Sequence, residues 1–163
     1  MQLFLAQTST PLGAMTAISS AAGVVALDFE GHTPTFSDAT FHEGDPHGVI
    51  AALDAYFGGA LDALEDLPVD PQGTDFQQRV WAALRGVRPG RTTSYGALAA
   101  ALGSPGASRA VGAANGANRV ALIIPCHRVV GADGSLTGYA GGVWRKRWLL
   151  EHESGRAQAT LGF

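Results

Sequence analysis

The single cysteine of the chain, Cys126, stands in the run Pro125-Cys126-His127-Arg128. The thiolate is the reactive form of cysteine, and neighbouring cationic groups favour it over the thiol. This context indicates a nucleophile, although a lone cysteine is more often a buried structural thiol. Adjacency alone does not bring His127 onto the sulfur, because neighbours on an extended chain point to opposite sides. A tight turn could bring the two side chains together.

Other kinds of site fit the residues less well. A cysteine protease needs a general base, which His127 or His152 could supply, and an oxyanion hole. A zinc site is poorly supported, because the other histidines show no paired-ligand spacing with the cysteine. The glycine-rich stretches lack the lysine pattern of a phosphate loop. We therefore expect no metal and no cofactor.

Acidic and basic residues are segregated along the chain. Residues 1–75 contain eleven acidic residues and no Lys or Arg, whereas residues 76–163 contain all 11 basic residues and three acidic ones. The net charge of -3 therefore hides a strongly basic second half. A basic half favours a polyanionic partner such as nucleic acid, although a basic face is often merely solvated. A protease would not explain the segregation.

The elements that must position the cysteine fall into two groups. In the first, β-like runs at 14–19 and 24–29 follow a short apolar start and predict a hairpin or meander. Residues 33–46 predict a loop or weak strand. Residues 49–57 show helical spacing that ends at a Gly-Gly pair. Turn formers at 66–73 predict a linker.

The second group is mostly helical. Thr74 and Gln77 predict a capping box at the start of a helix. Two short helices at 95–102 and 107–115, joined by a Gly-containing turn, have the sequence form of a helix-turn-helix. Further along we expect a short buried strand at 121–124 and a last helix at 143–152. The predicted domains are thus 1–72, with an acidic surface, and 73–163, which carries all of the basic residues and the cysteine.

No apolar run is long enough to span a bilayer, and the first residues do not resemble a signal peptide. A single cysteine cannot form an internal disulfide. These features favour a reducing, cytoplasmic location and no membrane partner.

Residues 73–153 resemble the O6-alkylguanine-DNA alkyltransferases. The matching motifs are Gly73-Thr74-Asp75-Phe76-Gln77, Val80-Trp81, Ser94-Tyr95-Gly96, Arg109-Ala110-Val111-Gly112, Ile123-Ile124-Pro125-Cys126-His127-Arg128-Val129-Val130 and Gly138-Tyr139-Ala140-Gly141-Gly142. The resemblance implies an α+β fold, with a small antiparallel sheet and a helix in the N-terminal domain. It implies a mostly helical C-terminal domain of winged helix-turn-helix type, 73–163, which would bind DNA and accept the alkyl group. The implied partner is double-stranded DNA bearing O6-alkylguanine. The protein would act as a monomer with no obligate protein partner, and it would be associated with the nucleoid when bound to DNA.

The resemblance also implies roles for individual residues. Cys126 would accept the alkyl group irreversibly, activated by His127 through a water, with His127 hydrogen-bonded to Glu153. Tyr95 would rotate the target phosphate or donate a proton to the departing base, and Asn118 would order the turn before the cysteine. Arg109 would fill the space left by the flipped guanine. The other implied DNA contacts are Tyr95, Gly96, Gln77, Ser104, Ser108, Ala110, Gly112 and Arg128, and the implied pocket residues are Pro125, Val129, Tyr139 and Ala140.

Arg119 and Ala140 depart from the family pattern. Arg119 stands where many members have proline, and it could add a phosphate contact. Ala140 stands where some members have a serine, and this difference would affect the reaction rate or the substrate range more than the kind of reaction.

Two other classes of protein are alternatives. Alkyltransferase-like proteins, which bind alkylated DNA without transfer, lack the cysteine, so Cys126 argues against that class. A winged-helix regulator with an incidental thiol would instead select a sequence in undamaged DNA.

Overall fold

The computed structural model describes residues 1–155, which divide into two compact units. Among the described residues, the first unit holds 1–72 and 119–123, and the second holds 73–118 and 124–155. The two units therefore follow the predicted domains 1–72 and 73–163 except for residues 119–123, which belong to the first unit. The segment 119–123 packs with the first unit because Leu27 N donates to Arg119 O at 2.8 Å and Ala121 N donates to Leu27 O at 3.0 Å.

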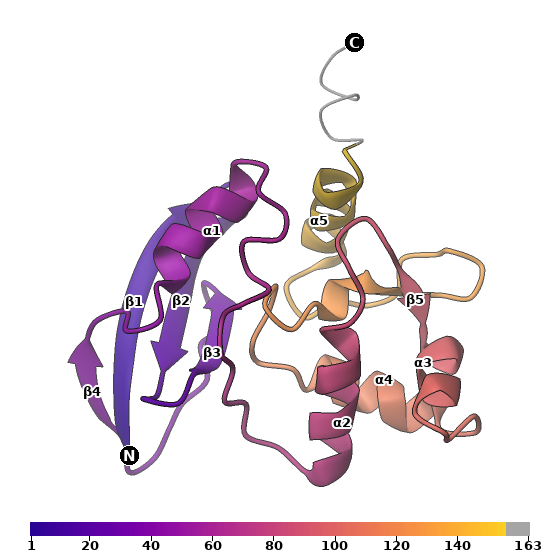
Figure 1. Cartoon of the computed structure of the whole chain (residues 1–163), viewed down its shortest axis with the longest axis horizontal. Helices are drawn as coiled ribbons and strands as arrows, with labels where there is room; N and C mark the ends of the chain where they lie inside the picture. The colour runs from indigo at the N-terminus through magenta and orange to yellow at the C-terminus, as the bar shows by residue number, and fades with distance from the viewer. Residues whose placement is uncertain (156–163) are drawn as a thin grey trace. The chain divides into compact units, whose positions relative to one another are not determined.

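A four-stranded sheet is the centre of the first unit. Its strands are β1 (Gln2–Thr10), β2 (Gly13–Ser19), β3 (Val24–Phe29) and β4 (Thr40–Glu43), in the order β3-β2-β1-β4. The first three pair antiparallel as expected, whereas β4 pairs parallel to β1. Helix α1 (Val49–Phe57) packs against β1 (Figure 1).

The outer edge of β3 is covered by two other segments of the chain. Val24 pairs with Val69, and Leu27 pairs with Val120, each as an isolated parallel bridge. A strand edge with unpaired backbone groups invites wrong pairing, so these bridges protect it. The predicted linker is therefore held to the sheet through Val69.

The described part of the second unit contains the α-helices α2 (Asp75–Leu84), α3 (Tyr95–Ala101), α4 (Ser108–Gly116) and α5 (Val143–Ser154). The predicted capping box is present, since Thr74 accepts from Gln77 N and Gln77 accepts from Thr74 N. The buried Trp81 donates from Nε1 to Ala114 O at 2.8 Å, which joins α2 to α4. Strands β5 (Thr93–Ser94) and β6 (Val129–Val130) form a short parallel pair. The expected α+β class, with sheet in the N-terminal part, is confirmed.

The strand expected at 121–124 is not formed. These residues are buried as predicted, but they turn: Leu122 has φ 69°, Ile123 N donates to Ala121 O at 2.8 Å, and Cys126 N donates to Ile124 O at 2.8 Å. A left-handed residue and two tight local hydrogen bonds leave the backbone unable to continue a ladder. The 3₁₀ turn η1 (Cys126–Arg128) follows directly.

Candidate active site and nucleic-acid interface

Cys126 begins η1 and is 6% exposed. Two asparagines hold the backbone around it. Asn118 Nδ2 donates to Ile124 O at 2.8 Å, and Asn115 Nδ2 donates to Cys126 O at 3.4 Å. Asn118 was expected to order this turn, and its bond lies where that role requires. Asn115, from the buried face of α4, was not anticipated from the sequence.

His127 and Arg128 share one buried carboxylate. His127 Nε2 lies 2.8 Å from Glu153 Oε2, and Arg128 donates from Nε to Oε1 and from Nη2 to Oε2, each at 2.8 Å. Arg128 Nη1 also donates to Val87 O at 2.7 Å. The ring of His127 is fully buried and Glu153 is 5% exposed. The turn of η1 and the face of α5 therefore assemble the His127–Glu153 contact that the resemblance implied.

Electrostatics in this cluster favour a neutral His127. Burial is the largest influence and lowers the pKa of His127, while the charge and hydrogen bond of Glu153 act in the opposite direction. Burial alone would raise the pKa of Glu153, but His127 and the hydrogen bonds from Arg128 hold that pKa well below its usual range. Glu153 is thus ionised and already paired with Arg128. A neutral imidazole can hydrogen-bond to an ionised carboxylate only by donating from an N–H group, so Nε2 carries the proton.

The other ring nitrogen of His127, Nδ1, is then an acceptor. It is buried and has no hydrogen-bond partner among the described residues. Buried polar atoms in native proteins are nearly always hydrogen-bonded, directly or through ordered water. The arrangement supplies what a general base needs: a neutral imidazole in a defined tautomer, fixed in orientation by a carboxylate.

A second polar chain in the same unit runs through Thr137. Tyr95 Oη lies 2.6 Å from Thr137 Oγ1, and Lys146 Nζ donates to Thr137 Oγ1 at 3.2 Å and to its carbonyl at 3.4 Å. The Tyr95 ring also packs beside Gly112 of α4. Neither Thr137 nor Lys146 was singled out from the sequence. The available signal was that Lys146 is the only lysine in the chain.

Helices α3 and α4 pack against each other with a short turn between them, as the helix-turn-helix pattern predicts. Helix α4 buries Val111, Ala114 and Asn115. Its exposed face consists of small residues with one long side chain, Arg109. Gly112 is half-buried beside Tyr95, and Gly96 lies near the hydroxyl of Ser108. A backbone that can approach a groove closely, with one protruding cation, suits a nucleic-acid interface.

The implied DNA contacts differ in how available their side chains are, and as contacts they stay predictions. Arg128 is 5% exposed and its guanidinium is committed to Glu153 and Val87 O, so it is a structural cation of the active site. Gln77 uses Oε1 to accept from Thr74 N. The other implied contacts lie at accessible positions: Ser104 and Ser108 are half-buried, and Ala110 and Gly96 are exposed.

The implied pocket residues differ in exposure. Pro125 and Val129 are buried on either side of η1, Tyr139 is half-buried and Ala140 is exposed. Gly142 N donates to Tyr139 O at 2.9 Å, which closes the loop that carries Tyr139 and Ala140. The lining role of these four residues stays a prediction.

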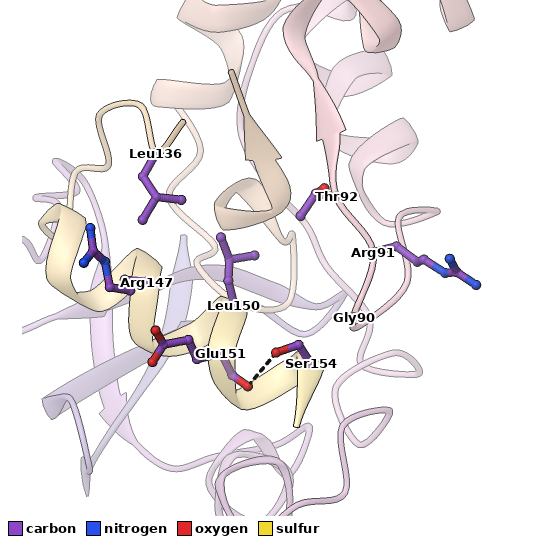
Figure 2. A pocket seen from close by; sticks show the side chains of 8 residues that line it. All are labelled: Gly90, Arg91, Thr92, Leu136, Arg147, Leu150, Glu151 and Ser154. Carbon is purple, nitrogen blue, oxygen red and sulfur yellow. Dashed lines mark hydrogen bonds between the residues drawn. The ribbon is translucent and has the colours of Figure 1, made fainter. Parts of the chain in front are cut away.

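Figure 2 shows a separate hollow of about 540 Å³ in the second unit. Leu150 and Leu136 face it, the Arg91 side chain points away from it, and Ser154 donates to the carbonyl oxygen of Glu151 at 2.9 Å. The lining residues are Gly90, Arg91, Thr92, Leu136, Arg147, Leu150, Glu151 and Ser154. None of them is an expected site residue. Among residues 1–155 there is no cluster of three metal-ligating side chains and no helix suited to crossing a membrane.

Comparison with known proteins identifies similar chains. Residues 75–155 match the family model described as the DNA-binding domain of 6-O-methylguanine DNA methyltransferase. A methylated-DNA–protein-cysteine methyltransferase of Mycobacterium tuberculosis is 52% identical over 130 residues, covering 80% of this chain and 78% of that protein. One from Salmonella typhimurium is 53% identical over 119 residues, covering 69% and 70%.

Solved structures give the same result at the level of the fold. The crystal structure of Mycobacterium tuberculosis OGT in complex with DNA matches with a TM-score of 0.84 at 44% identity, covering 96% of this chain and 94% of that one. An O6-methylguanine-DNA methyltransferase from the archaeon Pyrococcus kodakaraensis matches with a TM-score of 0.61 at 23% identity, and this likeness concerns the fold alone.

Proposed function

The chain belongs to the methylated-DNA–protein-cysteine methyltransferases, and on that premise we propose that Cys126 is the residue that accepts the alkyl group from O6-alkylguanine in DNA. The observation that carries the proposal is the buried His127–Glu153 contact directly beside the only cysteine. It supports an activated nucleophile in a chain whose relatives are named for transfer to cysteine. The family membership itself means direct repair of DNA by a single-use transferase.

The proposed chemistry begins with proton transfer. His127 Nδ1 takes the proton of the Cys126 thiol through a water, and Glu153 stabilises the imidazolium that forms. The sulfur attacks the saturated alkyl carbon, a sulfur–carbon bond forms, and the carbon–O6 bond breaks with its electron pair leaving on guanine. A donor must neutralise that charge, and Tyr95 is the residue proposed for it. The thioether has no low-energy leaving group, so each molecule repairs one lesion.

Access to the lesion requires base flipping. A cysteine that is 6% exposed cannot reach an alkyl group inside a duplex, so the nucleotide leaves the stack. Arg109 would then occupy the gap, while the small exposed residues of α4 allow close approach. Contacts to phosphates would dominate over contacts to bases, because lesions occur in any sequence. We include in the proposal a monomer without an obligate protein partner or metal, located in the cytoplasm.

Mass spectrometry tests the proposal directly. The protein is incubated with excess duplex containing O6-methylguanine, and the expected result is one added methyl group on the peptide holding Cys126, with guanine restored. Cys126→Ser is the matched control and should gain nothing. Repair of many lesions by each molecule, or methylation of the serine variant, would contradict the assignment. Binding to one undamaged operator sequence without transfer would favour a regulator instead.

A further inference from the structure

Asn115 is a buried asparagine in the last turn of α4, and one end of its amide has no hydrogen-bond partner among the described residues. The residue is 7% exposed. Its Nδ2 donates to Cys126 O at 3.4 Å, whereas its Oδ1 is buried and unpaired there. Buried amides are nearly always hydrogen-bonded, and asparagine is a poor helix former. The other buried residues of this helix, Val111 and Ala114, are apolar, so packing alone does not account for an amide at this position.

The contact with Cys126 also fixes which way the amide of Asn115 points. Exchanging its two ends would set Oδ1 against the carbonyl oxygen of Cys126, and two acceptors repel each other. Oδ1 belongs to the same planar group as Nδ2 and lies about 2.3 Å from it. The unpaired acceptor is therefore within about 6 Å of Cys126 O.

His127 supplies a second buried acceptor beside the same residue. Its Nε2 is directed at Glu153, so Nδ1 is the acceptor, and Nδ1 also has no partner among the described residues. Nδ1 is bonded to the ring carbon that carries the side chain, so it lies on the backbone side of the imidazole. Cys126 immediately precedes His127 in η1. Two acceptors in need of a donor thus lie near the residue whose thiol must lose its proton.

We propose that Asn115 is a positioning residue for this proton transfer: one water donates its two hydrogens to Asn115 Oδ1 and His127 Nδ1, which leaves its lone pairs to face the thiol of Cys126. The inference rests on the proposed alkyl transfer and adds Asn115 to it. A buried water typically makes about three hydrogen bonds, and these three groups supply them. An amide oxygen is too weak a base to take a proton, so the water can pass one only to Nδ1.

The path from the thiol through the water to Nδ1, called the relay below, balances in protons and electrons. The thiol gives its proton to the water oxygen while the water gives the hydrogen that it shares with His127 to Nδ1. The sulfur keeps the electron pair of the S–H bond, Glu153 stabilises the imidazolium, and the water keeps its hydrogen bond to Asn115. Without that hydrogen bond the water could turn a hydrogen toward the sulfur, and no proton would pass.

The first test compares rates of Cys126 alkylation by the free base O6-benzylguanine across a range of pH. Asn115→Leu removes both polar atoms at similar volume. The matched control is Val111→Ala, which disturbs the same face of α4 without loss of a polar atom. We expect Asn115→Leu to react on the order of tenfold more slowly at neutral pH, the size of one lost hydrogen bond. The difference should shrink above about pH 8.5, where thiols ionise without help.

The control should keep the wild-type pH profile. A loss in Asn115→Leu that does not vary with pH, or no loss, would overturn the inference. The charged groups that face Cys126 and His127 are Arg128 of η1 and Lys146 and Glu153 of α5. The buried residues of α2 and α4 carry no charge. Because Asn115→Leu leaves all of these groups in place, a changed pH profile reports on the relay.

A second test asks whether Asn115 acts through His127. In a His127→Ala protein the relay is already lost, so adding Asn115→Leu should slow the reaction little further. An equal factor in both backgrounds would show that Asn115 only supports the backbone of Cys126, which is incompatible with the inference.

One substitute variant and one further reagent cover the remaining outcomes. If Asn115→Leu does not fold, Asn115→Ala, which removes the same two atoms, replaces it in both tests. If folded wild type gains no benzyl group, the proposed function is contradicted. The rate at which iodoacetamide modifies Cys126 in the same variants then still tests the relay, with the same pH dependence and the same coupling to His127 expected.

Discussion

His127 Nε2 lies 2.8 Å from Glu153 Oε2, and the side chains of both residues are at most 1% exposed. This contact decides which ring nitrogen carries the proton, because an ionised carboxylate accepts and does not donate. Arg128 neutralises the same carboxylate from the other side, so Glu153 holds both residues that follow Cys126. The base of the proposed reaction is therefore oriented from α5, far along the chain from the cysteine.

The first prediction concerns this carboxylate. Glu153→Gln should slow transfer to Cys126 by on the order of a hundredfold or more, with little change in DNA affinity, because the amide cannot stabilise an imidazolium. Single-turnover rates with an O6-methylguanine duplex measure the effect, and Glu151→Gln on the same helix is the matched control. His127→Ala should slow transfer similarly. A folded Glu153→Gln protein that reacts at the wild-type rate would leave Glu153 with a structural role only.

The second prediction concerns the dependence of stability on pH. Burial raises the pKa of Asp28 from 3.8 to about 7, although His32 and Arg119 oppose the change. The folded chain therefore binds this proton more tightly than the unfolded chain does. The protonated carboxyl group consequently contributes to the free energy of unfolding at low pH, and this contribution is lost as pH rises from about 4 to about 7. Asp28→Asn should remove this loss in urea or thermal unfolding. The exposed Asp66→Asn should keep it, and an unchanged pH profile in Asp28→Asn would contradict the prediction.

Glu153 should act in the opposite direction. The pKa of Glu153 is held below the usual range in the folded protein. Its ionised carboxylate therefore contributes to the free energy of unfolding above the pKa of the unfolded chain, and this contribution is lost as pH falls. Below about pH 4 the Asp28→Asn protein should still lose stability for this reason.

The third prediction follows from the buried position of Arg128. Arg128→Met should destabilise the protein by about 3–5 kcal/mol, because Glu153 loses a partner in the core. The salt dependence of DNA binding by the folded fraction should not change. Urea unfolding and binding at several salt concentrations measure the two quantities, with the exposed Arg91→Met as control for loss of one positive charge. A stable variant with a weaker salt dependence would restore Arg128 as a phosphate contact.

The fourth prediction separates binding from flipping at Arg109. If Arg109 fills the gap in the stack, Arg109→Ala should slow repair of paired duplex much more than reaction with free O6-benzylguanine. A lesion opposite an abasic site, where unstacking costs less, should partly rescue the variant. If Arg109 only contacts a phosphate, binding to all duplexes should weaken and the salt slope should fall by about one. Equal slowing of the free-base and duplex reactions would exclude the flipping role.

Local chemistry was readable from the sequence because it depends on neighbours along the chain. The Thr74–Gln77 capping box spans one helical turn, and the spacing of the apolar residues in α1 follows from the helix period alone. The Pro125-Cys126-His127-Arg128 run and the motifs around it were enough to identify the family. The segregation of acidic and basic residues likewise needs no coordinates.

Tertiary structure decided what depends on packing between distant segments. The run 121–124 has the composition of a buried strand, but a left-handed Leu122 turns it, and the bridge from Leu27 to Val120 assigns its start to the first unit. Arg128 has the sequence context of a phosphate contact and the surroundings of a buried cation. In the sequence, Lys146 is one of several basic residues of the last helix. In the folded chain, it is buried on the helix α5 that packs against η1. A sequence states which residues carry charge, whereas burial and the nearest opposite charge are set only when the chain folds, and these decide what each charge does.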